Sequence, residues 1–163
     1  MEDGFEVLAE DHEEIGAVLD ELAKGPTVAT GACEDQLMLR KMMTEELIIE
    51  QAKHADIERI YLWPAVREHV PGGGPLADRA ICQQLEAGEL LAELDRLDAA
   101  DPGFEDVLSR FTRVGREHFD FEERQVWPRL RAVLPPKVAS ELGSKILQSR
   151  KAASVLPHPR AWA

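Results

Sequence analysis

The chain has 163 residues, with 31 acidic and 19 basic side chains and a formal net charge of −12 at pH 7. This length suits one domain with a single hydrophobic core. The charge argues against nucleic acid or an anionic membrane as a partner, because phosphate binding requires clustered Lys and Arg.

The sequence shows no targeting segment and few cysteines, which favours the cytoplasm. No apolar run approaches the roughly 20 residues that span a bilayer, and the acidic residues 1–4 (MEDG) do not resemble the start of a signal peptide. Only two cysteines are present, Cys33 and Cys82, so no disulfide framework is expected. We therefore expect a cytoplasmic protein, and its oligomeric state stays open.

Apolar residues recur at helical spacing along the chain and almost never alternate as they would in a strand. Five helices are predicted, over about residues 5–24, 34–68, 75–101, 104–133 and 136–150. Four long helices with short connections predict an all-α, antiparallel up-down four-helix bundle with a short fifth helix. We expect one domain over residues 1–152, with the bundle core at about 5–134, and an extended or disordered tail over 153–163.

Two segments of the predicted second and fourth helices repeat one another. HADIERIYLWPAVREHVP (54–71) and HFDFEERQVWPRLRAVLP (118–135) are identical at seven of 18 positions, which include a His-x-x-x-Glu pair and a Trp-Pro step. The first and third helices also match, with residues 11–22 aligned to residues 83–94. We interpret the chain as two helical hairpins related by duplication, and the Trp-Pro steps as packing elements that kink the helices near one end of the bundle.

The repeated His and Glu lie four residues apart, so each pair shares one face of a helix. The apolar residues around them predict that five side chains point into the bundle: His12, His54, Glu58, His118 and Glu122. A buried carboxylate is costly unless it is paired or bound to metal, and we expect no cation on these inward stripes. Three imidazoles and two carboxylates that face one interior therefore predict a metal site.

Each of these features also has a purely structural interpretation. A single His-x-x-x-Glu pair is more often a surface pair than a ligand pair, and an inward histidine such as His12 is usually only hydrogen-bonded. The repetition of the pair in both hairpins favours metal binding. Imidazole and carboxylate ligands without sulfur suit iron or manganese, with zinc as an alternative, and a helical bundle with inward Glu and His can hold two irons.

The pattern resembles the hemerythrin-like HHE cation-binding family over about residues 5–134. The family signature is matched by His12 in the first helix, by His54 with Glu58 in the second, and by His118 with Glu122 in the fourth. Residues 137–151 resemble the carboxy-terminal extension of a bacterial subgroup. The resemblance implies an antiparallel four-helix bundle with a non-haem iron centre. It favours two irons per chain, with one iron as the alternative, and a small diatomic molecule or peroxide as the ligand of the iron.

The third helix departs from the family pattern, because the duplication places Gln84 where the family has a histidine. Gln84 could act as a weak carbonyl ligand, hydrogen-bond a metal-bound water, or mark a lost iron position. Tyr61, three residues after Glu58, could donate a hydrogen bond to a bound ligand or serve only as a core aromatic.

Three functions are compatible with this sequence. The first is a non-haem iron protein that reacts with or senses oxygen, peroxide or nitric oxide, and whether it turns over a substrate is left open. The second is an iron storage or sensing module without turnover. The third is a metal-free acidic bundle with a structural or interaction role.

Overall fold

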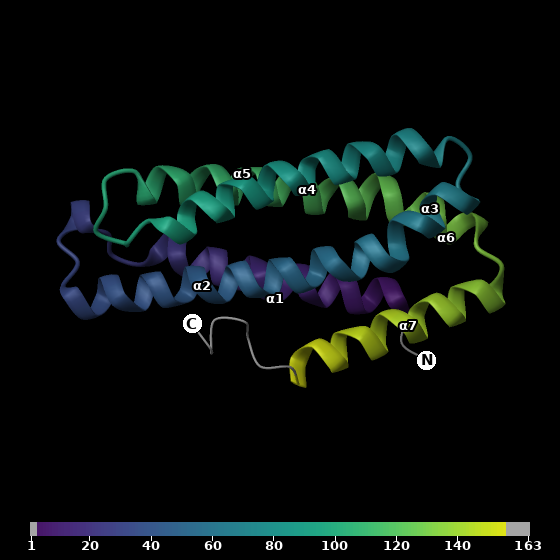
Figure 1. The fold of residues 1–163 in the computed structure, drawn as a ribbon, viewed down its shortest axis with the longest axis horizontal. Coiled ribbons are helices and arrows are strands. Elements are labelled where there is room, and N and C mark those ends of the chain that lie inside the picture. The colour runs from purple at the N-terminus through teal and green to yellow at the C-terminus, as the bar shows by residue number, and fades with distance from the viewer. Residues whose placement is uncertain (1–2, 156–163) are drawn as a thin grey trace.

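A computed structural model of the chain describes residues 3–155, and all of the regular structure in that range is helical. The helices are α1 (Gly4–Lys24), α2 (Glu34–Ile57), α3 (Trp63–His69), α4 (Gly73–Arg96), α5 (Phe104–Phe121), α6 (Trp127–Val133) and α7 (Pro136–Val155), with a short 3-10 turn at Val28–Thr30. One π-helical turn joins α2 to α3 (Glu58–Leu62), and another joins α5 to α6 (Glu122–Val126). Each pair of helices therefore forms one continuous rod, and the predicted antiparallel four-helix bundle is confirmed (Figure 1).

The third and fifth predicted helices differ from the observed ones at their ends. The helix α4 begins at Gly73 and ends at Arg96, about five residues before the expected end. The ammonium group of Lys41 accounts for this end, because it donates to the carbonyl oxygens of Leu94, Asp95 and Leu97 at 3.4, 2.9 and 2.6 Å. The helix α7 continues to Val155, so residues 153–155 are helical where we expected an extended tail. The rest of the predicted tail lies outside the described residues.

The hydrophobic core consists of two clusters with a polar layer between them. One cluster surrounds the tryptophans Trp63 and Trp127, and the other surrounds Phe104 and Phe111 at the opposite end of the bundle. Every long rod passes from one cluster to the other. The change of cluster falls between Leu8 and Ile15 on α1, between Ala80 and Ala87 on α4, and between Phe119 and Phe121 on α5. The inward His and Glu residues lie at or beside this change, so the polar layer has apolar side chains on both sides.

The expectation that no cation lies on the inward stripes is wrong for Arg40. This side chain of α2 is buried, makes two 2.6 Å contacts to the Glu105 carboxylate, and donates to the Leu22 carbonyl oxygen at 2.6 Å. Arg40 lies two turns beyond Leu47, in the half of the bundle that holds the Phe104 cluster. Its contacts to Glu105 and Leu22 lie away from the carboxylates of the polar layer.

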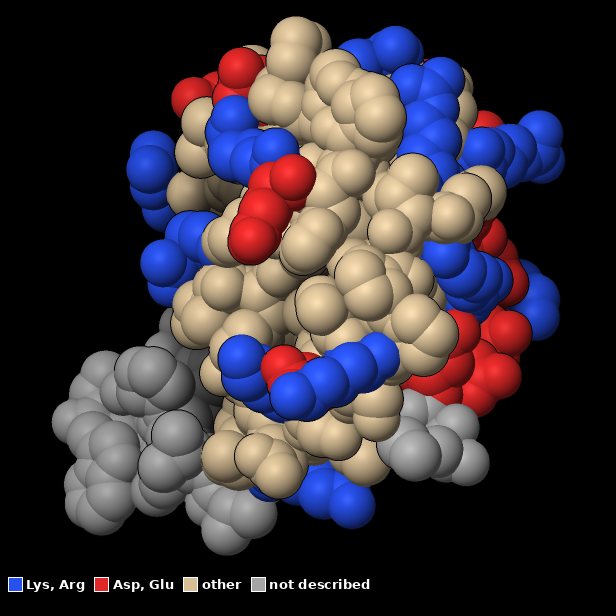
Figure 2. All heavy atoms as spheres, turned by 90° about the vertical axis from the view of Figure 1, so that its right-hand side faces the viewer, with Lys and Arg blue, Asp and Glu red and all other residues tan. Residues whose placement is uncertain are grey.

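Basic side chains are prominent around the end of the bundle formed by α3 and α6, where uncharged residues occupy the centre of the view (Figure 2). Within residues 3–155, no helix has the length and apolar character required to cross a membrane.

Candidate metal centre

Both Glu residues of the repeated pairs open a π-helical turn. In each turn, the backbone N–H of the following Trp bonds to a carbonyl five residues back, from Trp63 to Glu58 and from Trp127 to Glu122. The prolines that follow, Pro64 and Pro128, have no N–H and crowd the preceding turn, which favours the wider helix. π-Helical turns occur often at functional sites. The predicted kink is thus a local widening of the helix at the position of the candidate ligands.

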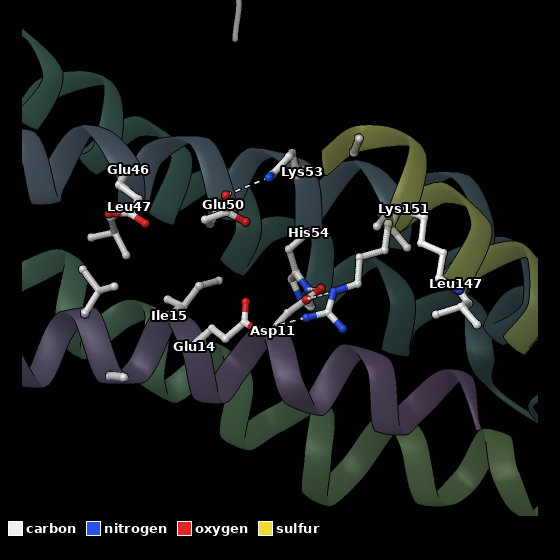
Figure 3. A pocket seen from close by; sticks show the side chains of 15 residues that line it. Asp11, Glu14, Ile15, Glu46, Leu47, Glu50, Lys53, His54, Leu147 and Lys151 are labelled. Carbon is white, nitrogen blue, oxygen red and sulfur yellow. Dashed lines mark hydrogen bonds and ion pairs between the residues drawn. The ribbon is translucent and has the colours of Figure 1, made fainter. Parts of the chain in front are cut away.

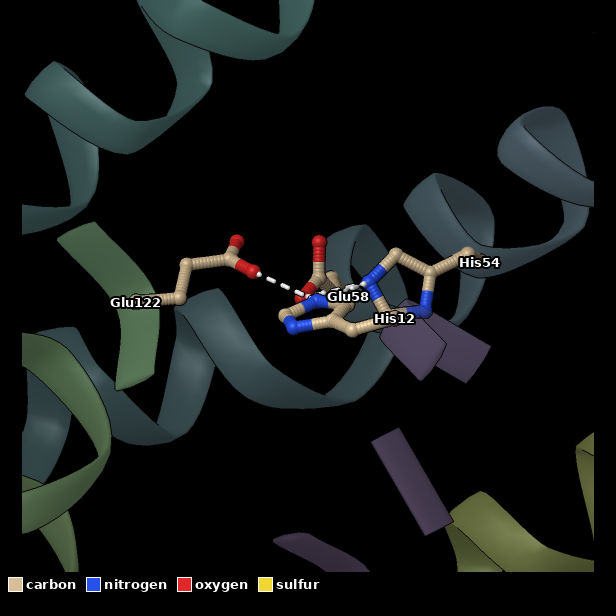
Figure 4. Close-up of side chains that lie close together, drawn as sticks. All are labelled: His12, His54, Glu58 and Glu122. Atoms are coloured by element: carbon tan, nitrogen blue, oxygen red, sulfur yellow. Dashed lines mark hydrogen bonds and ion pairs between the residues drawn. The ribbon is translucent and has the colours of Figure 1, made fainter. Parts of the chain in front are cut away.

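Four of the predicted ligands converge on one point in the polar layer: His12, His54, Glu58 and Glu122. One donor atom from each lies within 4.8 Å of the others, and all four side chains are buried (Figure 4). The Nε2 atoms of His12 and His54 are 3.1 Å apart. His12 Nε2 lies 3.1 Å from Glu122 Oε2, and His54 Nε2 lies 3.2 Å from Glu58 Oε1. We refer to this cluster of two imidazole nitrogens and two carboxylate oxygens as position A.

The second oxygen of each carboxylate faces a different group. Glu122 Oε1 lies 2.8 Å from His118 Nε2, and Glu58 Oε2 accepts a hydrogen bond from the Gln84 amide nitrogen. We refer to His118 with the second oxygens of Glu58 and Glu122 as position B, which offers one imidazole where position A has two. His118 contacts the four clustered side chains through Glu122.

Gln84 stands at the site, but its amide orientation is determined by Trp63. The indole N–H of Trp63 can only donate, and it lies 3.1 Å from Gln84 Oε1. The amide oxygen must therefore face Trp63, and the NH₂ group faces Glu58. Gln84 therefore donates a hydrogen bond to the candidate ligand Glu58, a contact that differs from the three roles expected from the sequence.

Each imidazole is held by a group on its outer nitrogen. The Nδ1 atom lies 3.0 Å from Asp11 Oδ2 in His54, 2.7 Å from Glu123 Oε1 in His12, and 2.9 Å from Gln83 Oε1 in His118. When the imidazole is neutral, such a contact places its proton on Nδ1 and leaves the Nε2 lone pair directed at the polar layer. The ring of His12 is also stacked against Phe119 and Trp127, with centroid distances of 3.8 and 4.9 Å.

Sequence reasoning missed these three orienting residues. The duplication contained a signal for two of them, because Asp11 and Gln83 are aligned at the same spacing as His12 and Gln84. Each of the two holds the histidine of the repeated pair in its own hairpin.

Burial and mutual charge perturb the titration of the polar layer. Burial, together with the charges of His54 and His118, lowers the pKa of His12 from 6.5 to about 2. Burial also lowers the pKa of His118 to about 4. Burial alone would lower the pKa of His54, but the charge of Glu58 and the hydrogen bond to the Asp11 carboxylate outweigh it, so this pKa lies well above 6.5. Burial and the charge of Glu58 raise the pKa of Glu122 well above 4.5.

Several donor atoms of this layer lack hydrogen bonds. The Oε1 atom of Glu58, both carboxylate oxygens of Glu122 and Nε2 of His118 are buried and make no hydrogen bond of acceptable geometry to any described residue. Such atoms are rare in folded proteins and call for an explanation. A divalent cation fits them, because it would accept their lone pairs and offset two carboxylate charges that otherwise repel each other.

Tyr61 lies outside both positions. It is half-buried and packs against the hydrophobic cluster that contains Trp63, in agreement with its interpretation as a core aromatic.

Two cavities reach the outer side of the site. One, of about 870 Å³, lies between α1, α2 and the end of α7 and includes His54 and Asp11 in its wall (Figure 3). The other, of about 430 Å³, lies between α1 and α5 and includes His12 and Glu123.

Taken together, a helical bundle with paired carboxylates and inward imidazoles defines a cation-binding bundle. The family model described as "Hemerythrin HHE cation binding domain" matches residues 3–130. This chain belongs to that family, and the expected resemblance is confirmed. A crystal structure of a hemerythrin HHE cation binding domain-containing protein from Mycobacterium kansasii superposes with a TM-score of 0.76 and 26% identity, and the match covers 94% of this chain and 89% of that chain. Among curated proteins, none matches this chain.

Proposed function

We propose that this chain binds iron in its polar layer, two ions per chain, and that the loaded protein reacts with or senses oxygen, peroxide or nitric oxide. The main support for this proposal is the set of buried donor atoms without hydrogen bonds on Glu58, Glu122 and His118. Imidazole and carboxylate donors without sulfur suit iron, with manganese and zinc as the weaker matches.

The two positions would differ in how completely the protein surrounds a metal ion. Position A offers two imidazoles and two carboxylate oxygens. Position B offers His118 and the second oxygens of Glu58 and Glu122, and Gln84 supplies a hydrogen bond to Glu58 in place of a further donor. A metal at position B would keep more coordination sites for a small molecule, which supports reaction or sensing there.

The protein's own residues supply orientation and exclude water. Asp11, Glu123 and Gln83 keep the Nε2 lone pairs of the three histidines directed inward. The apolar clusters on both sides of the layer lower the local dielectric and limit the entry of water. The metal ions would supply the redox chemistry and Lewis acidity.

The test is metal analysis after anaerobic loading with ferrous iron. His54→Ala should lower the occupancy at position A and His118→Ala the occupancy at position B, each by about one ion per chain. His69→Ala, which alters a histidine on α3 outside both positions, is the matched control and should keep the wild-type content. Full metal content in both ligand variants would contradict the assignment.

Reactivity is tested separately on the loaded wild type. Consumption of peroxide, or an optical change on addition of oxygen or nitric oxide, would support the proposed chemistry. Stable iron loading with neither response would favour storage.

A further inference from the structure

One arginine of α7 reaches the candidate metal centre through a carboxylate of α1. Arg150 lies on the last turns of α7 and reaches three carboxylates of α1. Its contacts are Nη1 to Glu10 at 2.6 Å, Nε to Asp11 at 2.9 Å and Nη2 to Glu14 at 3.1 Å. Asp11 differs from the other two because it also contacts a candidate ligand.

The carboxylate of Asp11 joins Arg150 to His54. Its Oδ1 atom faces Arg150 at 2.9 Å, and its Oδ2 atom accepts from His54 Nδ1 at 3.0 Å. Both side chains around Asp11 are constrained, since His54 is buried and only 24% of the Arg150 side chain is exposed. A continuous chain of contacts therefore leads from α7 to the inward nitrogen of His54.

The equivalent contact in the second hairpin has no such support. Gln83 corresponds to Asp11 by the duplication and holds His118 with a neutral amide oxygen at 2.9 Å. An amide carries no charge, whereas the carboxylate of Asp11 is charged and is stabilised by a cation such as Arg150. Because α7 packs on α1 and α2, its arginine reaches the first hairpin, and residues 3–155 show no arginine contact to Gln83.

Arg150 also occupies the part of the structure where Asp11 would otherwise meet water. Arg150 lines the cavity of about 870 Å³ between α1, α2 and α7, and so does Asp11, which is labelled in Figure 3. Without the arginine, the Asp11 carboxylate could be hydrated from this cavity and adopt other rotamers. The loss of its fixed position would release the ring of His54.

The position of α7 on α1 is set independently of Arg150. A Cβ built on Gly4 would lie 2.8 Å from the Gly143 Cα atom, which shows that the two helix backbones meet closely there. Ile146, one turn further along α7, is almost fully buried. Removal of the Arg150 charge should therefore leave most of α7 in place.

We propose that Arg150 is a positioning residue for the candidate metal ligand His54, acting through Asp11, so that metal binding and the seating of α7 are coupled. This inference rests on the proposed metal site. Coupling of this kind is reciprocal: a metal that favours the oriented His54 also favours the docked end of α7. Loss of a group that orients a metal ligand typically costs 10–100-fold in metal affinity.

The experiment compares Arg150→Met with wild type by anaerobic titration with ferrous iron and with cobalt(II) as a spectroscopic probe. We expect about a tenfold weaker affinity and an altered cobalt spectrum. Lys151→Met, which removes a neighbouring exposed cation on α7, is the matched control and should change the affinity less than about twofold. Equal affinities for Arg150→Met and Lys151→Met would overturn the proposal.

A double-mutant cycle separates this relay from a general loosening of α7. In an Asp11→Asn background, Arg150→Met should have little further effect on metal affinity, because the carboxylate that transmits it is gone. Additive effects of the two substitutions would overturn the relay through Asp11.

A readout on the metal-free protein keeps this proposal apart from the proposed function. The ¹⁵N chemical shifts of His54 report the protonation and hydrogen bonding of its two ring nitrogens, and they should change in Arg150→Met and not in Lys151→Met. If wild type binds no metal and these shifts still change, the proposed function fails while the positioning role stands. Unchanged shifts would overturn the positioning role whatever the metal result.

Discussion

Replacement of Glu122 with Gln should shift the stability of the metal-free and the metal-loaded protein in opposite directions. The Glu122 side chain has no solvent exposure, and both of its oxygens lack hydrogen bonds. In the metal-free fold at neutral pH, this carboxyl either carries a buried charge or takes up a proton. A neutral amide of the same shape avoids that cost, and its NH₂ group can donate to the nearby Nε2 of His118.

The expected size follows from the burial. Removal of a poorly satisfied buried charge should stabilise the metal-free protein by about 1–3 kcal/mol. For a chain of this length, 1 kcal/mol corresponds to about 2–4 °C in Tm, so we expect a rise of roughly 2–10 °C. In the presence of iron, wild type should gain about 2.7 kcal/mol at a metal concentration of 100 Kd, and the variant should lose most of this gain.

The pH dependence of stability gives a second check on the predicted effect of Glu122→Gln. The pKa of Glu122 is raised in the fold, so between about pH 4.5 and that raised value the folded protein holds a proton that the unfolded chain releases. The stability of metal-free wild type attributable to this carboxyl therefore falls as the pH rises through this window. The advantage of Glu122→Gln should grow over the same range and then level off.

The assay is thermal unfolding with a chelator and with ferrous iron, at several pH values. Glu89→Gln, which alters an exposed carboxylate of α4, is the matched control and should leave both Tm values unchanged. If Glu122→Gln destabilises the metal-free protein as strongly as the loaded one, the carboxylate has a partner in the fold and the argument for a cation fails.

Three further predictions follow from particular residues. Gln84→His should reproduce at position B the contact that His12 makes at position A, so iron titration should show tighter binding of the second ion and slower peroxide consumption; unchanged occupancy and spectrum would place residue 84 outside the site. Because His12 and His118 keep pKa values of about 2 and 4 in the fold, the metal-free protein should lose up to about 1.4 kcal/mol per pH unit for each of them as the pH falls from 6.5 towards 4. Urea unfolding of wild type and His118→Gln tests this, since equal pH slopes would contradict it. Arg40→Met leaves the half-buried Glu105 without its partner and should destabilise the fold by about 3–5 kcal/mol. At a temperature where this variant stays folded, its metal affinity should equal that of wild type.

The sequence by itself determined the bundle and the residue types of its polar layer. The helical spacing of apolar residues and the internal duplication predicted four long helices, and the repeated His-x-x-x-Glu pairs predicted which side chains turn inward. These features are local, because a helix has one period and residues four apart always share a face. The family resemblance depended on the same residues.

The tertiary structure decided which of these side chains belong to position A and which to position B. Which oxygen of Glu122 faces His12 and which faces His118 depends on the rotation of each helix against its neighbours, and that rotation is set by packing across the bundle. The same holds for the turn of Gln84 towards Trp63. The π-helical turns also required the structure, because a Trp-Pro step permits either a kink or a wider turn and only the surrounding core selects between them.

The contact between α7 and the site is the feature that was least predictable from the sequence. Arg150 and Asp11 are far apart in the chain, and nothing in their local sequence relates them. They meet because α7 crosses α1 where two glycine backbones can approach closely, at Gly4 and Gly143. Helical spacing in the sequence therefore determined the chemistry of the site. The residues that orient its histidines come from distant segments, which only the packed fold brings into contact.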